Sequence, residues 1–582
     1  MQNWLKQRTA ELARIPVLLR RVAPAIRSAK ASGTAPWLAW LEAHALNNPE
    51  GLCCELDAER LSYGEAWSRV RAYAAVLVEQ GVRPADIVAL IAGNSPSYLV
   101  LVLAIAYAGG AAALIHPELQ GEPLAHALSS VKPRLSLVEA SERDGISALS
   151  AKARGATLTF ARGELEALAE GAEPLATPRA DPNGDFVFIF TSGTTGLPKP
   201  CRVRHARARS AATIFGSVAF EFRASDKLYC ALPLHHSSAL LVGVGAALVA
   251  GVPIALRRKF SAREFAPDIA RYGATATLYI GEVCRAVVRA PRFEPLPSLR
   301  VAVGNGMDDG TWLAFAERFP RAKIREFYAS TEAPSAILNL TGKVGSLGHV
   351  PFERRRGFRL ARLDEARHEL VRDAGGRAVP CAPNEAGELL LRVHPTQNEP
   401  HGEFAGYQDE AASRARIVRD AFELGDAYFR SGDVLRRDAD GYFYFVDRLG
   451  DGYRWKGENV SALEVERVLS RALEPAQVAV FGVTVPGHPG RAGFAEVECD
   501  GAFDAQRFAR ATRELPAHAR PCFVRKVAEI ELTSSFKIKK RALDLASLVG
   551  AGRESIWVKQ GESYVVLDSK LWDDLCRGEK RL

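Results

Sequence analysis

The stretch that decides the fold is residues 186–200, which reads FVFIFTSGTTGLPKP. Its first five residues are apolar and strand-prone, so they predict a buried strand that delivers a polar loop to the end of a sheet. Gly193 and Gly196 let the backbone curl until consecutive N–H groups point into one concavity. The remaining polar groups of the loop belong to Thr191, Ser192, Thr194, Thr195 and Lys199. Such a loop suits the phosphate tail of a nucleotide.

The spacing within this loop differs from that of the common GxxxxGK[ST] phosphate-binding loop. Lys199 stands three residues beyond Gly196, and no Ser or Thr follows it. By composition alone, a turn of glycines and hydroxyls is an ordinary surface loop. The positions of Gly193, Gly196, Pro198 and Lys199 relative to one another favour the phosphate interpretation.

The chain of 582 residues is too long for one hydrophobic core, so two or more domains are expected. Its composition, 47% apolar and 25% charged, is that of a soluble globular protein. A net charge of +8 is mild for this length, and the basic residues are dispersed along the chain. An anionic substrate or membrane surface is compatible with this charge, whereas nucleic acid is not an expected partner.

Nine cysteines form no CxxC pair, and the two closest, Cys53 and Cys54, are adjacent. This spacing excludes a zinc ribbon and argues against a disulfide framework, so a reducing cytoplasm is the expected compartment. No uninterrupted apolar segment with a small-residue cleavage site opens the chain, and no secretory signal is expected. The basic, partly apolar segment 1–34 fits either an anionic membrane surface on the inner face of a membrane or packing on the folded domain.

Helices and strands alternate as far as about residue 340. Ser62 and Glu65 make a capping box for a helix that Gly81 ends, and residues 87–91 then form a strand. The apolar run 97–115 is nearly long enough to span a bilayer, but Gly109 and Gly110 divide it, so helix–turn–strand is the alternative. Residues 238–256 repeat this pattern. The alternation predicts a largely parallel α/β fold.

The second half of the chain changes character. Residues 354–393 predict a β-rich subdomain, whereas a helix from Ser461, a strand at 478–485 and a helix from Asp504 predict a small α+β domain. The polar segment between them is a plausible hinge. The predicted divisions are an N-terminal extension at 1–59, a large domain at 60–446, a hinge at 447–453 and a mobile domain at 454–582.

Five stretches, the first of them within residues 186–200, occur in the order seen in adenylate-forming enzymes. They are TSGTTGLPK (191–199), FYASTE (327–332), RSGD (430–433), VDRLGD (446–451) and KGEN (456–459). YIGEVCR (279–285), GVTVPGHPGRAG (482–493) and LTSSFKIKK (532–540) resemble the fatty acid transport protein and very-long-chain acyl-CoA synthetase branch. The resemblance runs from about residue 60 to the C-terminus. It implies the adenylate-forming fold, with a large α/β domain and a small mobile α+β domain.

The resemblance implies a role for each matching residue of the large domain. Residues 191–199 would hold the β- and γ-phosphates of ATP, and Gly304, Asn305 and Gly306 match the adenine-binding loop. Tyr328 would cover one face of the adenine. Thr331 would bond the α-phosphate, and Glu332 would supply a carboxylate to Mg²⁺, which prefers oxygen ligands. His236 matches an acyl-site position and fits either a pocket wall or proton chemistry.

Matching residues nearer the C-terminus would complete the site. Asp433 would accept the two ribose hydroxyls, with Arg448 as a positive donor beside it. Lys537 would bridge the substrate carboxylate and the α-phosphate, where negative charge builds up during attack. Gly457 would let the pantetheine arm of CoA pass close to the backbone, and Gly450 stands at the pivot of the hinge.

Three departures from the family pattern affect rate and substrate choice more than reaction class. Pro200 follows Lys199 where a small residue is usual. Ala329 replaces the usual glycine of the FYASTE motif, and Ser534 to Phe536 precede Lys537 where many acyl-CoA synthetases have a serine–glycine pair.

The function implied is ATP-dependent ligation of a long- or very-long-chain fatty acid to CoA through an acyl-adenylate. One alternative keeps the fold and changes the acceptor, so that the acyl group is loaded onto a carrier protein or an amine. A second alternative is a membrane-associated protein for fatty acid uptake or binding whose catalysis is reduced.

Overall fold

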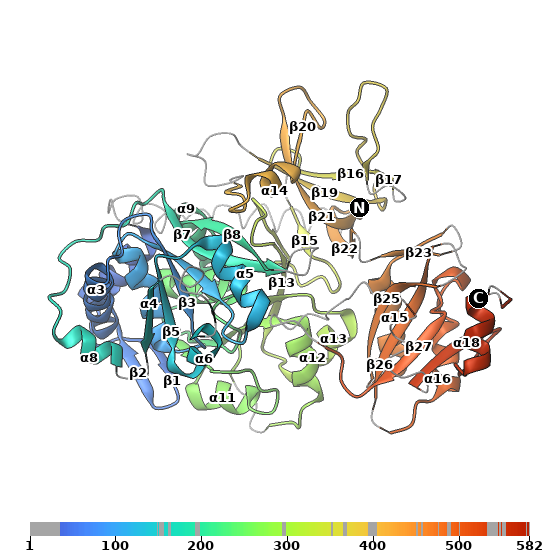
Figure 1. Cartoon of the computed structure of the whole chain (residues 1–582), viewed down its shortest axis with the longest axis horizontal. Coiled ribbons are helices and arrows are strands. Elements are labelled where there is room, and N and C mark those ends of the chain that lie inside the picture. Colours follow the sequence, from blue (N-terminus) through green and yellow to red (C-terminus); the bar gives the residue numbers. More distant parts are fainter. Residues whose placement is uncertain are drawn as a thin grey trace. The chain divides into compact units, whose positions relative to one another are not determined.

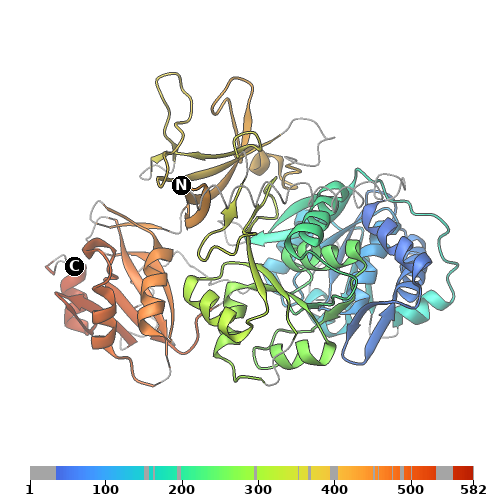
Figure 2. The same ribbon diagram turned by 180° about the vertical axis from the view of Figure 1, so that it is seen from behind.

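The computed structural model describes residues 35–147, 149, 156–160, 164–192, 198–293, 298–350, 353–364, 369–393, 404–449, 452–455, 458–474, 476–485, 490–499, 501–531, 545, 549, 555–577, 579–580 and 582. The chain forms two compact units (Figures 1 and 2). Unit 1 comprises residues 1–349, 391–419 and 427–429, and unit 2 comprises residues 350–390, 420–426 and 430–582.

Unit 1 contains two sheets whose inner strands are parallel. The first has the order β14-β13-β12-β11-β9-β10-β1-β2 and the second the order β6-β5-β3-β4-β7-β8. The strands of the first sheet are β1 (Leu52–Leu56), β2 (Glu59–Ser62), β9 (Leu228–Cys230), β10 (Ile254–Leu256), β11 (Ala276–Ile280), β12 (Val301–Asn305), β13 (Lys323–Tyr328) and β14 (Ile337–Leu338). Only its edge pairs β1–β2 and β13–β14 are antiparallel. The predicted parallel α/β architecture is therefore confirmed.

The second sheet carries the stretch 186–200. Its strands are β3 (Ile87–Ile91), β4 (Ala111–Ile115), β5 (Leu135–Glu139), β6 (Ala156–Phe160), β7 (Asp185–Ser192) and β8 (Pro198–Arg204). Four consecutive residues of β7, from Phe186 to Ile189, are buried, as their apolar sequence predicts. β7 pairs in parallel with β4 and antiparallel with the edge strand β8.

Helices cover both sheets of unit 1. They are α2 (Pro36–Asn47), α3 (Tyr63–Glu79), α4 (Pro96–Tyr107), α5 (Gly121–Val131), α6 (Arg143–Ser147), α8 (Glu164–Glu170), α9 (His205–Ile214), α10 (Gly245–Ala250), α11 (Phe265–Tyr272), α12 (Gly281–Arg289) and α13 (Asp309–Arg318). Apolar side chains of α5 and α6 pack with Ala89, Ile91, Ile115 and Val138 on one face of the second sheet. α2 packs against α9 and α10, and Figure 2 shows these blue and green helices side by side.

Local signals in the sequence set several of these boundaries. The Ser62 hydroxyl accepts a hydrogen bond from the Glu65 N–H, and the Glu65 carboxylate accepts one from the Ser62 N–H, so the predicted capping box starts α3. The apolar run 97–115 folds as α4, a turn at Gly109, where φ is +91°, and β4. The helix–turn–strand alternative is therefore the observed one. Within the described residues no helix has both the length and the apolar character needed to cross a bilayer.

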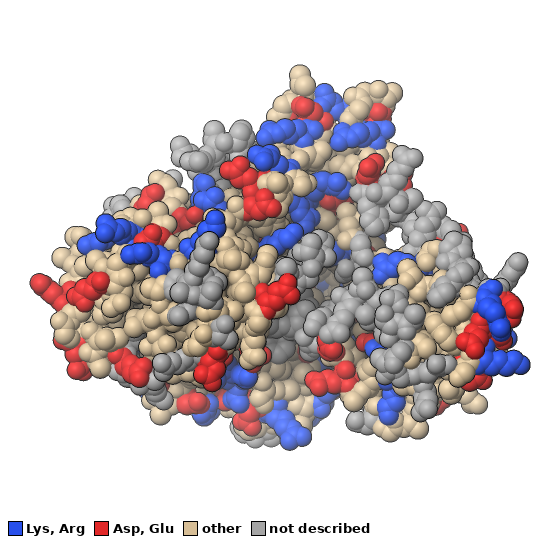
Figure 3. All heavy atoms as spheres, viewed as in Figure 1, with Lys and Arg blue, Asp and Glu red and all other residues tan. Residues whose placement is uncertain are grey.

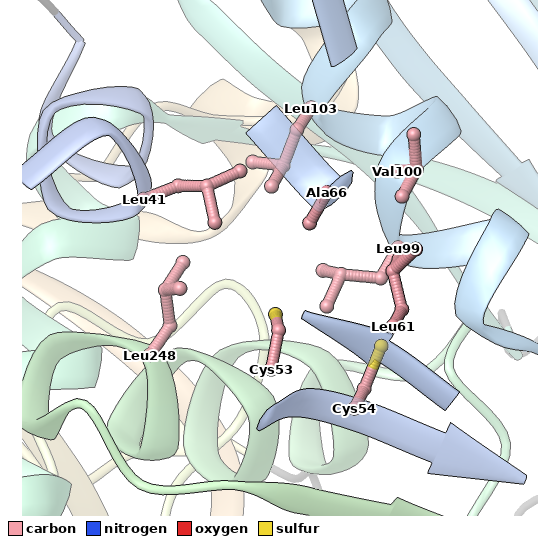
Figure 4. A pocket seen from close by; sticks show the side chains of 9 residues that line it. All are labelled: Leu41, Cys53, Cys54, Leu61, Ala66, Leu99, Val100, Leu103 and Leu248. Atoms are coloured by element: carbon pink, nitrogen blue, oxygen red, sulfur yellow. The ribbon is translucent and has the colours of Figure 1, made fainter. Parts of the chain in front are cut away.

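A tightly packed apolar contact joins α2, α3, α4 and α10 to β1 and β2 (Figure 4). Leucines from α2, α4 and α10 meet Cys53 and Cys54 of β1 there. A hydrogen bond between the two thiols, together with burial, raises the pKa of Cys54 well above its usual value, so the thiol stays protonated. All nine cysteines are free thiols, and these two belong to the core.

Unit 2 contains the β-rich region and the C-terminal α+β region. The strands of the β-rich region are β16 (Phe358–Ala361), β19 (Ala386–Arg392), β21 (Ala427–Arg437) and β22 (Tyr442–Arg448), in the order β22-β21-β19-β16, with the small hairpin of β17 (Leu363–Asp364) and β18 (Glu369–Leu370). A turn forms at residues 373–376, where Asp373 Oδ1 accepts from the N–H groups of Gly375 and Arg377.

The C-terminal region of unit 2 is built on a five-stranded sheet. Its strands, in sheet order, are β25 (Gln477–Thr484), β26 (Arg491–Glu498), β27 (Phe523–Val527), β28 (Ile556–Gln560) and β29 (Ser563–Val566), and its helices are α15 (Ala462–Leu473), α16 (Ala505–Thr512) and α18 (Ser569–Cys576). Ser461 and Asp504 cap α15 and α16, as the sequence predicts.

The predicted boundaries at residues 59, 446 and 453 remain predictions. Gly450 and Asp451, in the middle of the predicted hinge, lie outside the described residues. Residues 35–59 of the predicted extension form α2 and β1 within unit 1.

Candidate active site

Three of the predicted site segments follow the carboxyl ends of parallel strands in the first sheet. His236 follows β9, Gly306 follows β12, and Thr331 and Glu332 follow β13. β9, β11, β12 and β13 are consecutive neighbours in that sheet and run in the same direction. Loops at the carboxyl ends of parallel strands are where α/β proteins bind ligands. The fold therefore brings these segments to one edge.

Asn94 ties this edge to the carboxyl ends of the second sheet. It follows β3 and is 4% exposed. Its amide donates to the carbonyls of Leu232 and Arg257 at 2.9 and 3.0 Å, and its Oδ1 accepts from the Leu234 N–H at 2.8 Å. These partners follow β9 and β10, so one buried amide fastens loops from both sheets. All of its hydrogen-bonding capacity except one acceptor position is used.

Three imidazoles form a row of ring contacts with His235 in the middle. The rings of His116, which follows β4, and His235 are 4.6 Å apart, and those of His235 and His236 are 4.3 Å apart. Burial, followed by the neighbouring imidazoles, lowers the pKa of His235 well below its usual value. A neutral, buried His235 therefore packs between the other two rings.

Thr331 contacts the same histidine-bearing loop. Its Oγ1 lies 3.0 Å from Ser237 Oγ, one residue beyond His236. The Ser330 hydroxyl accepts from the Ala333 N–H at 3.1 Å, so a local turn presents Thr331 and Glu332 between them. An Arg207 guanidinium nitrogen donates to the Ala333 carbonyl and fixes the end of that turn. The FYASTE and LPLHHSS segments, far apart in sequence, are neighbours in the fold.

The Gly304–Gly306 turn is shaped by close backbone approach. A Cβ at Gly304 would lie 2.2 Å from the Tyr279 carbonyl oxygen, and φ at Gly306 is +79°. Buried Glu326 of β13 braces the turn, because it accepts from the Met307 N–H at 3.1 Å and from the Tyr279 hydroxyl at 2.7 Å. Asn305 Oδ1 is buried and, within the described residues, has no hydrogen-bond partner. An unsatisfied buried acceptor is costly, and an exocyclic amine of a base could satisfy it.

In the opening stretch 186–200, the structure describes residues 186–192 and 198–200, which belong to β7 and β8. Thr191 of β7 pairs with Lys199 of β8, and Ser192 pairs with Pro198, so the strands enclose the intervening loop as a hairpin. Gly193, Thr194, Thr195 and Gly196 lie outside the described residues, as do Gly450, Gly457 and Lys537. Tyr328, the last residue of β13, is 7% exposed.

Unit 2 contains the predicted ribose ligand. Asp433 is 2% exposed, and its Oδ1 accepts from Arg448 Nε at 3.0 Å across the β21–β22 pair. Glu388 of β19 is fully buried and accepts from the Gly432 N–H at 3.1 Å and from two Arg430 nitrogens at 2.6 and 3.0 Å. This charged pair braces β21 at Gly432, where φ is +73°.

The sequence patterns did not single out Asn94, Glu326, Glu388 or Tyr407. Glu326 lies one residue before the FYASTE motif, and Glu388 lies in the buried run GELLL, where a lone acid signals a paired carboxylate.

Within the described residues no cluster of three or more His, Cys, Asp or Glu side chains could hold a metal ion by itself. On the face shown in Figure 3, basic and acidic side chains are interspersed.

Comparison with known proteins identifies the family. The model of the family described as "AMP-binding enzyme" matches residues 41–396. The chain belongs to this family. The match begins before residue 60, where the sequence motifs alone placed the start of the resemblance. The family match of this AMP-binding enzyme therefore includes the second half of α2 and all of β1.

Its relatives are similar along most of their length. Long-chain fatty acid transport protein 1 of Mus musculus is 35% identical over 605 aligned positions, which cover 98% of this chain and 91% of the relative. Medium/long-chain-fatty-acid–CoA ligase FadD6 of Mycobacterium tuberculosis is 34% identical over 533 positions, covering 90% of this chain and 88% of the ligase.

Solved structures share the fold. ATP-bound MatB from Rhodopseudomonas palustris is 23% identical and superposes with a TM-score of 0.74 over 87% of this chain and 97% of MatB. The o-succinylbenzoate CoA synthetase MenE from Bacillus subtilis, in complex with AMP, gives a TM-score of 0.69 over 86% of this chain and 98% of MenE, at 20% identity. The adenylate-forming fold expected from the sequence is confirmed.

Proposed function

We propose that this AMP-binding enzyme is an ATP-dependent fatty acid–CoA ligase, acting on long or very long chains through an acyl-adenylate. The observation that carries the proposal is similarity over most of the chain to a named fatty acid–CoA ligase and to long-chain fatty acid transport proteins. The arrangement of Thr331, Glu332, His236 and the Gly304–Gly306 turn at one edge of the first sheet supports it.

In the first half-reaction, a carboxylate oxygen of the fatty acid attacks the α-phosphorus of ATP, and the bond to pyrophosphate breaks. The Gly304–Gly306 turn and the ring of Tyr328 hold the adenine, and the Asn305 amide hydrogen-bonds to its edge. Asp433, which also accepts a hydrogen bond from Arg448, accepts the ribose hydroxyls. The Thr331 hydroxyl donates to the α-phosphate, and Lys537 stabilises the charge that develops there. Residues 191–199 retain the pyrophosphate.

Glu332 has the chemistry to hold Mg²⁺, which takes carboxylate and phosphate oxygens as ligands. Its Oε1 accepts a hydrogen bond, and within the described part of the chain its Oε2 has no hydrogen-bond partner. When bound, the ion would neutralise phosphate charge. In the second half-reaction the thiolate of CoA attacks the acyl carbon and AMP leaves, with Gly457 leaving room for the pantetheine arm. Gly450 in the predicted hinge 447–453 belongs to the same proposal, as the pivot between the two half-reactions.

The basic segment 1–34, which lies outside the described residues, supports a peripheral contact with anionic membrane on the cytoplasmic side within this proposal.

The deciding experiment is pyrophosphate release across a panel of carboxylates from short to very long chains, with and without CoA. We expect release and a hydroxylamine-trapped acyl group without CoA, and an acyl-CoA thioester with CoA. Trapping without any thioester would replace CoA with a carrier protein or an amine as the acceptor. Release with no carboxylate of the panel would refute the ligase proposal.

A matched pair of variants separates catalysis from fatty acid binding. Lys537→Ala should lower adenylation by about 10²–10³-fold, the usual loss when one group that stabilises developing charge is removed. Lys539→Ala removes a positive charge two residues farther along the same stretch, LTSSFKIKK (532–540), and should leave adenylation unchanged. Fatty acid binding retained by both variants, with equal adenylation, would favour an uptake or binding protein instead.

A further inference from the structure

The carboxylate of Glu332 has a hydrogen-bond donor that lies outside the sequence motifs. The Tyr407 hydroxyl, 75 residues away in sequence, donates to Glu332 Oε1 at 3.1 Å. Tyr407 is 8% exposed, whereas Glu332 is half-buried. The hydrogen bond occupies one carboxylate oxygen, and the other oxygen is the one left to bind a cation.

The backbone of β8 fixes the position of Tyr407. Cys201 of β8 and Tyr407 form an antiparallel bridge, with the Arg202 N–H donating to the Gly406 carbonyl at 3.2 Å and the Gln408 N–H donating to the Pro200 carbonyl at 3.4 Å. The Tyr407 N–H also donates to Ser413 Oγ at 2.8 Å. Residues 406–408 therefore extend the sheet beside the strand that leaves the phosphate loop.

The phenol is suited to orient a carboxylate without neutralising it. The Tyr407 hydroxyl is an uncharged donor that holds the Glu332 carboxylate through one of its oxygens. A neutral donor leaves the negative charge of Glu332 available to a cation. Hydrogen bonds to ligating carboxylates commonly fix ligand geometry, and their loss weakens metal binding about 10–100-fold.

We propose that Tyr407 is a positioning residue that orients Glu332 toward the divalent cation bound with ATP, and that it couples this carboxylate to the phosphate-loop strand β8. The inference rests on the proposed function, in which Glu332 serves the cation. It also gives a role to residues 406–408, the segment that carries Tyr407, to which the proposed ligase function by itself assigns none.

The test is Tyr407→Phe, which keeps the ring and removes only the hydroxyl. Mn²⁺ binding is measured by electron paramagnetic resonance on the full chain saturated with the nonhydrolysable analogue α,β-methylene-ATP. We expect Mn²⁺ to bind about 10-fold more weakly to the variant than to the wild type. In pyrophosphate release, the half-saturating Mg²⁺ concentration should rise by a similar factor, with the rate at saturating Mg²⁺ within about twofold of the wild type.

Tyr229→Phe is the matched control. It removes a buried tyrosine hydroxyl that donates to a carboxylate of the same unit, Asp268, at 2.9 Å. Asp268 keeps its pairs with Arg257 and Arg271, so Mn²⁺ binding should be unchanged in this variant. A loss of Mn²⁺ affinity in both variants would show a general effect of destabilisation and would overturn the inference.

A double-mutant cycle with Glu332→Gln tests the route of the effect. In that background, Tyr407→Phe should cause no further loss of Mn²⁺ affinity, because the ligand it orients is already gone. An equal loss in both backgrounds, or unchanged Mn²⁺ affinity in Tyr407→Phe alone, would refute the role of Tyr407. Failure of the wild type to release pyrophosphate would refute the ligase proposal, and the Mn²⁺ measurement would still decide the role of Tyr407.

Discussion

Acid should destabilise unit 1 through His205, and His205→Phe should remove that sensitivity. The imidazole is 2% exposed, its Nδ1 has no hydrogen-bond partner within the described residues, and its ring centroid lies 4.9 Å from that of Phe186. Burial lowers its pKa from 6.5 to about 4, although Asp181 opposes part of this shift. The folded protein therefore holds the ring in its neutral form beside β7, the strand that precedes the predicted phosphate loop.

The magnitude follows from proton linkage. Between the folded pKa of about 4 and the unfolded value of 6.5, the unfolded chain binds more protons than the folded one. Stability is therefore complete above pH 6.5 and falls as the pH decreases through this window. At about 1.4 kcal/mol per unit, the loss from this one group approaches about 3 kcal/mol below pH 4 and is about 2 kcal/mol at pH 5.

The measurement is native-state hydrogen exchange of β7 amides at pH 7.5 and pH 5.0 for the wild type and His205→Phe, corrected for intrinsic exchange. Phenylalanine keeps the aromatic contact with Phe186 and cannot ionise. The opening free energy of the wild type should fall by about 2 kcal/mol more than that of the variant between pH 7.5 and pH 5.0. His126→Gln on α5 is the control, since it removes an imidazole far from Phe186 in sequence. A difference between His205→Phe and the wild type that does not change with pH would refute the reasoning.

Two further variants should separate the nucleotide and acyl parts of the site. Glu326→Ala leaves the buried Met307 N–H and Tyr279 hydroxyl without their acceptor, so it should destabilise unit 1 by about 3 kcal/mol. It should also raise the KM for ATP more than the KM for the fatty acid. Glu326→Gln should have a smaller effect, because the amide oxygen still accepts one hydrogen bond. Asn94→Ala should cost a similar amount by urea denaturation but raise the KM for the fatty acid more, because it frees the loop that bears His236. Equal effects on both KM values in either variant would contradict the assignment.

Local signals in the sequence predicted much of this fold correctly. The apolar run before Thr191 folds as a buried strand, and the capping box at Ser62 starts a helix. These elements form where expected because a continuous apolar run and short-range hydrogen bonds determine them. Gly109 also resolves the alternatives for residues 97–115, since its positive φ ends a helix of only 12 residues.

Contacts between distant residues could not be predicted in this way. Tyr407 meets Glu332, and Asn94 meets the carbonyls of Leu232 and Arg257, only because separate strands end at the same edge. Nothing in the residues around Asn94 specifies these partners. Glu388 was recognisable as a buried acid that needs a partner, but that partner, Arg430, lies on another strand. Burial predicts that such a group is paired, and topology decides with what.

Pro200 shows how a departure from the family pattern can be accommodated by register alone. It pairs with Phe190 in β7, and its carbonyl accepts from the Gln408 N–H on the opposite side. In a strand the N–H and C=O of one residue point the same way, so the missing N–H of Pro200 also faces residues 406–408 and removes no bond to β7. Proline therefore fits this position without loosening the hairpin that holds Thr191 against Lys199. A proline at 201 would face β7 instead and break the ladder at Ile189.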